Sequence, residues 1–186
     1  LDYNSLIIYS YFMALRQILT EPNQILRKKS LPVDKVDEDL QKLMDDMAET
    51  MYAAPGIGLA AIQVGVPKRI IVLDIAQKDS PRNPMFFVNP EIIEKSENYS
   101  IYEEGCLSVP GQFAEIQRPD GCHIKYLDYH GNQKEVKARG MLATCMQHEI
   151  DHLEGILFID YLSKLKKSMI IKKLSKQKKV LERIVV

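Results

Sequence analysis

The segment His148-Glu149-Ile150-Asp151-His152 constrains this chain more than any other part of its sequence. At about 100° per residue, two histidines four positions apart lie on one face of a helix, one turn from each other. Both imidazoles can then reach one metal ion, and Glu149 lies to the side, within reach of a water molecule on that ion. The pattern is typical of two metal ligands and a general base, and it predicts a helix that carries a catalytic metal.

The alternative interpretation is that the histidines only decorate a helix. A pattern with three fixed positions also arises by chance, and these are two of the four histidines in the chain. However, the predicted helix that carries the motif is otherwise apolar, and His and Glu side chains without partners are costly to bury there. The surroundings of the motif therefore favour the metal site.

A third ligand is available in Glu104-Gly105-Cys106-Leu107-Ser108. One thiolate and two imidazoles form a tetrahedral set with a position open for water, which distinguishes a catalytic site from a closed structural one. The alternative for Cys106 is a small buried hydrophobic residue, and we prefer that alternative for Cys122 and Cys145. Because Cys145 precedes His148 by three positions, we expect it to line the wall of the site without binding metal.

The segment from Gly56 to Gln63, with the sequence GIGLAAIQ, is a third candidate for function. Its two glycines allow a close backbone approach or a positive φ. A dinucleotide-binding fingerprint would need a further glycine and a preceding strand, and both are lacking. Gln63 is a candidate donor to an oxyanion, and the alternative is an amide on the surface.

The spacing of apolar residues predicts an α+β fold. A helix capped by Asp37 should end near Ala53, before Pro55 and Gly56. Strands are expected at Arg69–Ile75, Met85–Ile93, His123–Tyr129 and Lys134–Ala138, the last two joined by a turn at Gly131-Asn132. A helix from Gly140 to Gly155 and a last helix over about 161–184 follow. We thus expect short antiparallel sheets packed around a central helix carrying the His-Glu-x-x-His motif, with a long C-terminal helix.

Length and composition favour one catalytic domain. A chain of 186 residues, 46% apolar and 27% charged, can bury a core without disulfides. Three cysteines, an odd number, indicate a reducing compartment. Residues 1–12 lack a basic segment and are too short to span a bilayer. Since Met13 resembles a natural start, we expect residues 1–12 to be an upstream extension and 13–186 a single domain.

The formal net charge of zero conceals a basic C-terminal helix, which covers about residues 161–186. Residues 164–186 carry nine Lys or Arg and one Glu, a local charge of +8, so the rest of the chain carries −8. The zero total gives no overall attraction to nucleic acid or membrane. The simplest interpretation of the basic helix is a solvated lysine face whose apolar side packs on the body.

Three motifs, at 56–63, 104–108 and 147–152, occur together and in this order. In this combination the sequence resembles the peptide deformylases, which remove the formyl group from nascent bacterial and organellar proteins. The resemblance covers about residues 13–186. It implies a hydrolase that releases formate from formyl-methionyl peptides. It also favours the cytoplasm of a bacterium over an organelle, since no transit peptide is evident.

The resemblance also implies a role for each site residue. A ferrous ion would be bound by Cys106, His148 and His152, with water as the fourth ligand and nucleophile. Glu149 would take the proton of that water and deliver it to the leaving amine. The Gln63 side chain and the Leu107 N–H would hold the oxyanion. The donor set alone suits iron and zinc alike, and nickel or cobalt are further alternatives in purified protein.

The substrate would bind beside this centre. The resemblance implies that Ile57 and Gly58 contact the peptide backbone, partly in strand fashion. The pocket for the first side chain, usually Met, would be formed by Ile57, Tyr102, Glu104, Met141, Thr144, Cys145 and His148. Phe113 is a departure, because many bacterial members have at this position an arginine that contacts the substrate. Either Arg118 takes its place or the substrate carbonyl is held differently.

The C-terminal helix resembles the version found in Gram-negative members, where it is associated with docking on the ribosome. A basic helix beside ribosomal RNA is electrostatically favourable. We therefore expect formylated nascent peptides as substrates, the ribosome as a partner through this helix, no membrane association and a monomer.

Two other functions compete with this interpretation. A zinc metallopeptidase shares the His-Glu-x-x-His motif but usually takes its third ligand downstream, where Glu154 is one turn too close and Asp160 is a further candidate. His123 and His130 lie upstream, in the predicted hairpin. A structural metal module or an inactive relative would lack the open position or the base, whereas Glu149 and Gln63 are both present.

Overall fold

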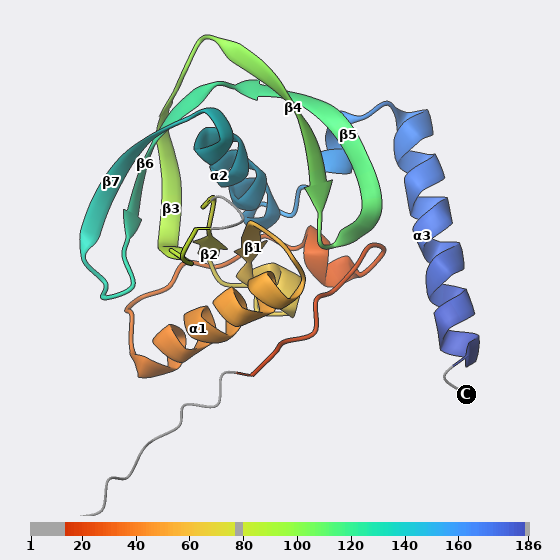
Figure 1. The fold of residues 1–186 in the computed structure, drawn as a ribbon, viewed down its shortest axis with the longest axis horizontal. Helices are drawn as coiled ribbons and strands as arrows, with labels where there is room; N and C mark the ends of the chain where they lie inside the picture. The colour runs from red at the N-terminus through yellow and green to blue at the C-terminus, as the bar shows by residue number, and fades with distance from the viewer. Residues whose placement is uncertain (1–13, 77–79, 185–186) are drawn as a thin grey trace, which may run out of the picture.

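The structure is a computed structural model that describes residues 14–76 and 80–184. The predictions for residues 1–12 and Met13 lie outside the described residues. Helix α2 (Gly140–Leu153) lies at the centre, between a five-stranded sheet and a two-stranded one (Figure 1). This arrangement confirms the predicted α+β fold with antiparallel sheets around the helix that carries the histidines.

The five-stranded sheet has the order β1-β2-β3-β6-β7, with every neighbouring pair antiparallel. Four of its strands were predicted to within two residues at each end: β2 (Ile70–Leu73), β3 (Met85–Lys95), β6 (Gly121–Leu127) and β7 (Gln133–Arg139). Strands β6 and β7 are joined by the predicted turn, in which the Gly131 N–H donates to the Asp128 carbonyl. The fifth strand, β1 (Gly58–Ala60), was not predicted, and it continues into the 3₁₀ helix η2 (Ala61–Val64).

The two-stranded sheet consists of β4 (Tyr99–Cys106) and β5 (Val109–Pro119) and was also missed by the sequence analysis. Its strands contain exposed glutamates and are interrupted by Gly105, Pro110 and Gly111, residues that are depleted in strands. One face of the hairpin is exposed and the other covers α2. This hairpin places the Glu104–Ser108 motif beside the central helix.

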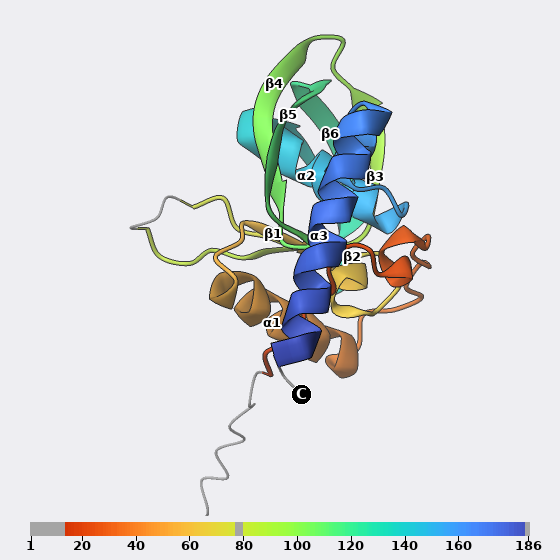
Figure 2. The same ribbon diagram turned by 90° about the vertical axis from the view of Figure 1, so that its right-hand side faces the viewer.

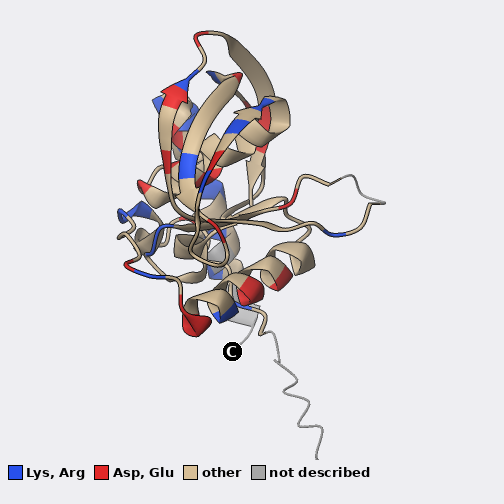
Figure 3. Cartoon of the chain, turned by 90° about the vertical axis from the view of Figure 1, so that its left-hand side faces the viewer, with Lys and Arg blue, Asp and Glu red and all other residues tan. Residues whose placement is uncertain are grey.

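Helix α1 (Glu38–Ala53) has the predicted ends. The Asp37 side chain accepts a hydrogen bond from the Leu40 N–H at 3.1 Å, which satisfies one of the free donors of the first turn. One face of the helix packs on a core cluster that includes Leu59, Ile70 and Val72. Acidic positions lie along the helix (Figure 3), as expected for an acidic body beside a basic tail.

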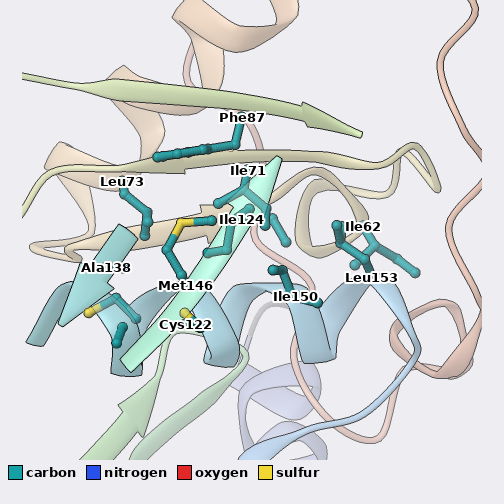
Figure 4. Packing of buried hydrophobic residues seen from close by; sticks show 13 residues of the cluster. Ile62, Ile71, Leu73, Phe87, Cys122, Ile124, Ala138, Met146, Ile150 and Leu153 are labelled. Atoms are coloured by element: carbon teal, nitrogen blue, oxygen red, sulfur yellow. The ribbon is translucent and has the colours of Figure 1, made fainter. Parts of the chain in front are cut away.

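Helix α2 is buried over ten of its fourteen residues, including the two histidines and Glu149. Its apolar side packs on the sheet in one core cluster with Ile71, Phe87 and Ile124; Met146 lies near Ile124, and Leu153 lies beside Ile62 at the end of the helix (Figure 4). A helix that is apolar on most sides belongs in the centre of a fold. The helix gives way to Gly155, as predicted, and there the backbone has a φ of 75° that favours glycine.

The C-terminal helix begins later than predicted. Residues Phe158–Tyr161 form a 3₁₀ helix, η3, in which the Asp160 side chain accepts a hydrogen bond from the Leu157 N–H. Helix α3 spans Lys164–Ile184 and lies on the outside of the molecule (Figure 2). It packs through Leu174 on a small cluster that contains Ile116 of β5 and Phe158 of η3. No helix in the described ranges is long and apolar enough to cross a membrane.

Candidate active site

Three side chains with metal-binding atoms meet between α2 and the end of β4. The sulfur of Cys106 lies 3.2 Å from Nε2 of His152, and the rings of His148 and His152 are 5.0 Å apart. One ligand atom from each of these residues falls within a mutual distance of 4.8 Å. The structure therefore brings together the three residues that the sequence analysis named as ligands.

The hydrogen bonds of His148 leave it suited to bind a metal. Its Nδ1 lies 2.8 Å from Oε2 of Glu104. A carboxylate only accepts, so Nδ1 carries the proton and Nε2 keeps its lone pair for a ligand. A thiolate and two imidazoles form a donor set that suits zinc or iron(II). The residues of this site therefore fit a divalent metal ion.

Glu149 lies beside this donor set and is buried. Its Oε1 occupies the space above Gly58 that a Cβ would fill, and its Oε2 has no hydrogen-bond partner among the described residues. Burial raises the pKa of this carboxyl to about 7. A group with that pKa can both accept and release a proton near neutral pH.

Gln63 points its amide into the same space from η2. Its Oε1 accepts from the Ala60 N–H at 2.8 Å, and its Nε2 lies 3.1 Å from Ser108 Oγ and 3.6 Å from Cys106 Sγ. With 1% of its surface exposed, it is not the surface amide of the alternative interpretation. Because the Ala60 N–H can only donate, the atom of the Gln63 amide that it contacts must be the oxygen, and the NH₂ group therefore faces Cys106. Leu107 lies in the turn directly after Cys106.

A cavity of about 470 Å³ opens onto these residues. It is lined by every residue that the sequence analysis named except His152, which is fully buried behind it: Ile57, Gly58, Gln63, Tyr102, Glu104, Cys106, Leu107, Met141, Thr144, Cys145, His148 and Glu149. Phe113 also lines it. Burial raises the pKa of the Cys145 thiol to about 12, which is consistent with a wall residue. A larger concavity, of about 640 Å³, lies over β3, β6 and β7 and has none of these groups.

Arg118 does not take the place of an arginine at position 113. Its guanidinium is 4% exposed and is held by two carboxylates. Its Nε and Nη2 donate to Oε1 and Oε2 of Glu104 at 2.5 and 3.0 Å, and its Nη1 donates to Asp151 Oδ2 at 2.8 Å. It is therefore not free to contact a substrate. Sequence analysis missed these contacts because the partners lie 14 and 33 positions away.

Comparison with known proteins agrees with this geometry. The family model for polypeptide deformylase matches residues 15–168. The chain belongs to this family. A peptide deformylase from Pelagibacter ubique is 65% identical over 166 residues, covering 89% of this chain and 96% of that protein. One from Maricaulis maris is 59% identical, covering 92% and 98%. The crystal structure of a peptide deformylase from Ehrlichia chaffeensis, 44% identical, has a TM-score of 0.85 and covers 90% and 98%.

Membership of the family identifies the chain as an enzyme. It is a metal-dependent hydrolase that removes the formyl group from nascent polypeptides. A second structure of the Ehrlichia chaffeensis protein, 46% identical to this chain, is a complex with actinonin.

Proposed function

We propose that this chain performs deformylation in the cavity between α2 and the β4–β5 hairpin, with a metal ion held by Cys106, His148 and His152. The observation that carries this proposal is the meeting of the three ligand atoms within 4.8 Å, beside a buried carboxylate. When bound, the ion polarises the formyl carbonyl and lowers the pKa of water towards about 7. We propose Fe²⁺ from the family resemblance; the donor set also accommodates Zn²⁺, Ni²⁺ or Co²⁺.

Glu149 acts as the general acid and base. It takes a proton from the attacking water and then delivers that proton to the amine that leaves when the C–N bond of the formamide breaks. Its pKa of about 7 suits both steps. Its Oε2, which has no hydrogen-bond partner in the part of the chain that the structure describes, is available to the water.

Gln63 and the Leu107 N–H stabilise the oxyanion that forms on the formyl oxygen. The contact of Gln63 Oε1 with the Ala60 N–H supports this role, because it holds the donor before the substrate arrives. Such preorganised donors typically contribute about 3 kcal/mol to the transition state.

The remaining lining residues bind the peptide. Ile57 and Gly58 pair with its backbone, and the side chain of the first methionine enters a pocket formed by Tyr102, Met141, Thr144 and Cys145, with Glu104 and His148 at its base. Phe113 supplies an apolar surface in place of a cation at the mouth of the cavity. The substrate carbonyl near it is therefore held by other groups.

The basic face of α3 docks on the ribosome. Eight lysines lie along this helix, and none of its described residues lines the catalytic cavity. Lysines bind the phosphates of RNA with an affinity that falls strongly as salt rises. We further propose that residues 13–186 are one catalytic domain preceded by an extension, and that the protein acts as a monomer in the bacterial cytoplasm.

The decisive assay is release of formate from a formyl-Met peptide. The wild-type protein should release formate and should not cleave the matched unformylated peptide, whereas Glu149→Ala should be inactive but still bind metal. Equal activity in both proteins would overturn the role of Glu149, and cleavage of the unformylated peptide would support a metallopeptidase. Activity that is present after anaerobic purification and lost in air would support Fe²⁺, since zinc has no redox chemistry in this role.

A further inference from the structure

A chain of contacts leads from His148 to the surface at Tyr161, outside the catalytic cavity. We call Glu104, Arg118, Asp151 and Tyr161 the Arg118 network. Glu104 contacts His148 Nδ1, Arg118 binds Glu104 and Asp151, and the Tyr161 hydroxyl donates to Asp151 Oδ2 at 2.9 Å. The guanidinium also lies 4.9 Å from the centre of the Tyr161 ring. Four side chains from β4, β5, α2 and η3 thus form one connected group.

Arg118 is the fixed centre of this network. Its planar fork binds both oxygens of Glu104 on one side, and a third nitrogen binds Asp151 on the other. A guanidinium held in this way cannot rotate without breaking charge-assisted bonds. It is also buried, so it cannot exchange these bonds for water at low cost. The position of Arg118 therefore depends on Asp151 as much as on Glu104.

The position of Arg118 in turn affects His148. Oε2 of Glu104 accepts from both Arg118 Nη2, at 3.0 Å, and His148 Nδ1, at 2.8 Å. Rotation of the guanidinium would move this shared oxygen and, with it, the imidazole ring. Partners of this kind orient metal ligands, and their loss weakens metal binding about 10- to 100-fold.

Asp151 and Tyr161 themselves lie outside the cavity. Asp151 precedes His152 on α2 but its carboxylate contacts Arg118 and Tyr161. Tyr161 is about half exposed and belongs to η3, immediately before α3. Neither side chain lines the cavity, so the contacts that link them to His148 run through Arg118 and Glu104. The charge of Asp151 also raises the pKa of Glu149 directly, and the test below therefore measures metal release besides activity.

We infer that Asp151 and Tyr161 are positioning residues, which clamp Arg118 and, through Glu104, fix the ring of His148 as a metal ligand. This inference rests on the proposed function in taking His148 as a ligand. The Arg118 network then connects the metal centre to the segment that starts the C-terminal helix.

The test measures metal release as well as activity. The protein is loaded with Co²⁺ under anaerobic conditions. The visible spectrum of the bound Co²⁺ and the rate at which a chelator removes the ion are then recorded. Asp151→Asn should release Co²⁺ about tenfold faster than wild type, with a changed spectrum, and Tyr161→Phe about two- to threefold faster. Both should lower kcat more than they raise KM.

Glu154→Gln is the matched control. Glu154 is also a carboxylate at the end of α2, but its side chain pairs with Arg69 and Lys29 and not with the Arg118 network; only its backbone N–H meets the network, at the Asp151 carbonyl, and the substitution keeps that bond. Its variant should release Co²⁺ within about twofold of wild type, because it removes the same charge without freeing Arg118. Thermal unfolding of the metal-free proteins separates effects on folding from effects on metal binding.

A double mutant tests the route. If Asp151 acts through Arg118 and Glu104, then adding Asp151→Asn to Glu104→Gln should cause little further acceleration. The inference is overturned if Asp151→Asn behaves like Glu154→Gln, or if its effect is unchanged in the Glu104→Gln background. If wild type itself binds no Co²⁺ through Cys106, the proposed function fails with it; if wild type binds and the variants are unchanged, only the inference fails.

Discussion

Oε1 of Glu149 lies closer to the position of a Cβ on Gly58 than two such atoms can approach, so the carboxylate in this place and a side chain at position 58 exclude each other. Cδ2 of Leu73 closes the same space at 2.8 Å from that Cβ position. Strand β1 and helix α2 approach this closely only because residue 58 is glycine. The relationship joins the segment proposed to bind the peptide to the proposed base.

Gly58→Ala should therefore impair catalysis by displacing Glu149. We expect kcat to fall at least about tenfold, since small misplacements of a catalytic group cost that much or more, while the metal content stays near that of wild type. Steady-state kinetics and metal analysis measure both. Gly121→Ala, in β6 and outside the cavity, is the control and should keep kcat within about twofold. An unchanged kcat in Gly58→Ala would contradict the proposed position of the base.

Gln63→Ala should lower kcat by about 100-fold and change KM little, because an oxyanion donor acts in the transition state. Metal binding should be retained, since Gln63 Nε2 approaches Cys106 Sγ only at 3.6 Å. Formate release under saturating substrate and metal titration distinguish these effects. A rise in KM with normal kcat would indicate that Gln63 binds the ground state instead.

Met146→Ala should destabilise the fold by about 2–5 kcal/mol, the range for truncating a fully buried side chain. Met146 is fully buried between α2 and the sheet. The matched control is Met169→Ala on α3, where the side chain is 63% exposed, and the expected change is within about 0.5 kcal/mol. Urea unfolding followed by circular dichroism provides the comparison, and equal losses would contradict the packing of α2.

Asp46 should contribute stability that disappears in acid. Burial raises the pKa of its carboxyl, but the Ala14 N–H and the Arg16 guanidinium outweigh burial and hold that pKa below its ordinary value. A lowered pKa means that the stabilisation is complete above the unfolded-state pKa of about 3.9 and is lost as the pH falls through the lower folded-state value. Asp46→Asn should thus be less stable than wild type at pH 7, and the difference should shrink below about pH 4.

Urea unfolding at several pH values measures this difference. The exposed Asp34→Asn is the control for the loss of a surface carboxylate and should change the free energy of unfolding at pH 7 by no more than about 0.5 kcal/mol. If the difference in the free energy of unfolding between Asp46→Asn and wild type grew as the pH fell, the predicted direction of the Asp46 pKa shift would be wrong.

Docking of α3 on the ribosome is best tested without truncation. Leu174 packs under β5 and η3, so deleting the helix would also expose part of the core. Replacing Lys172, Lys173 and Lys176 by Ala should leave deformylation unchanged and weaken co-sedimentation with ribosomes most at low salt. The control replaces Lys125 and Lys134 on the sheet. Equal co-sedimentation of both variants would exclude a specific role for α3.

Local signals explain which parts of the fold could be predicted. Asp37 and Pro55 mark the ends of α1, and the change of spacing after Gly140 marks α2. The β4–β5 hairpin was missed because its pairing, such as Glu103 with Glu115, follows no apolar alternation. The ligands were found because histidines one turn apart are a local pattern. The contacts of Gly58 with Glu149 and of Arg118 with Asp151 join segments that are distant in the sequence, and no local sequence pattern predicts them.

The burial of α2 on nearly all sides has a consequence for how this enzyme can vary. The helix that bears His148, Glu149 and His152 also supplies Met146, Ile150 and Leu153 to the main core. A substitution within α2 that moves the site residues therefore also requires the core between α2 and the sheet to repack. Divergence in substrate preference has more freedom on the open rim, at Ile57, Phe113 and Met141, where side chains change without repacking the interior.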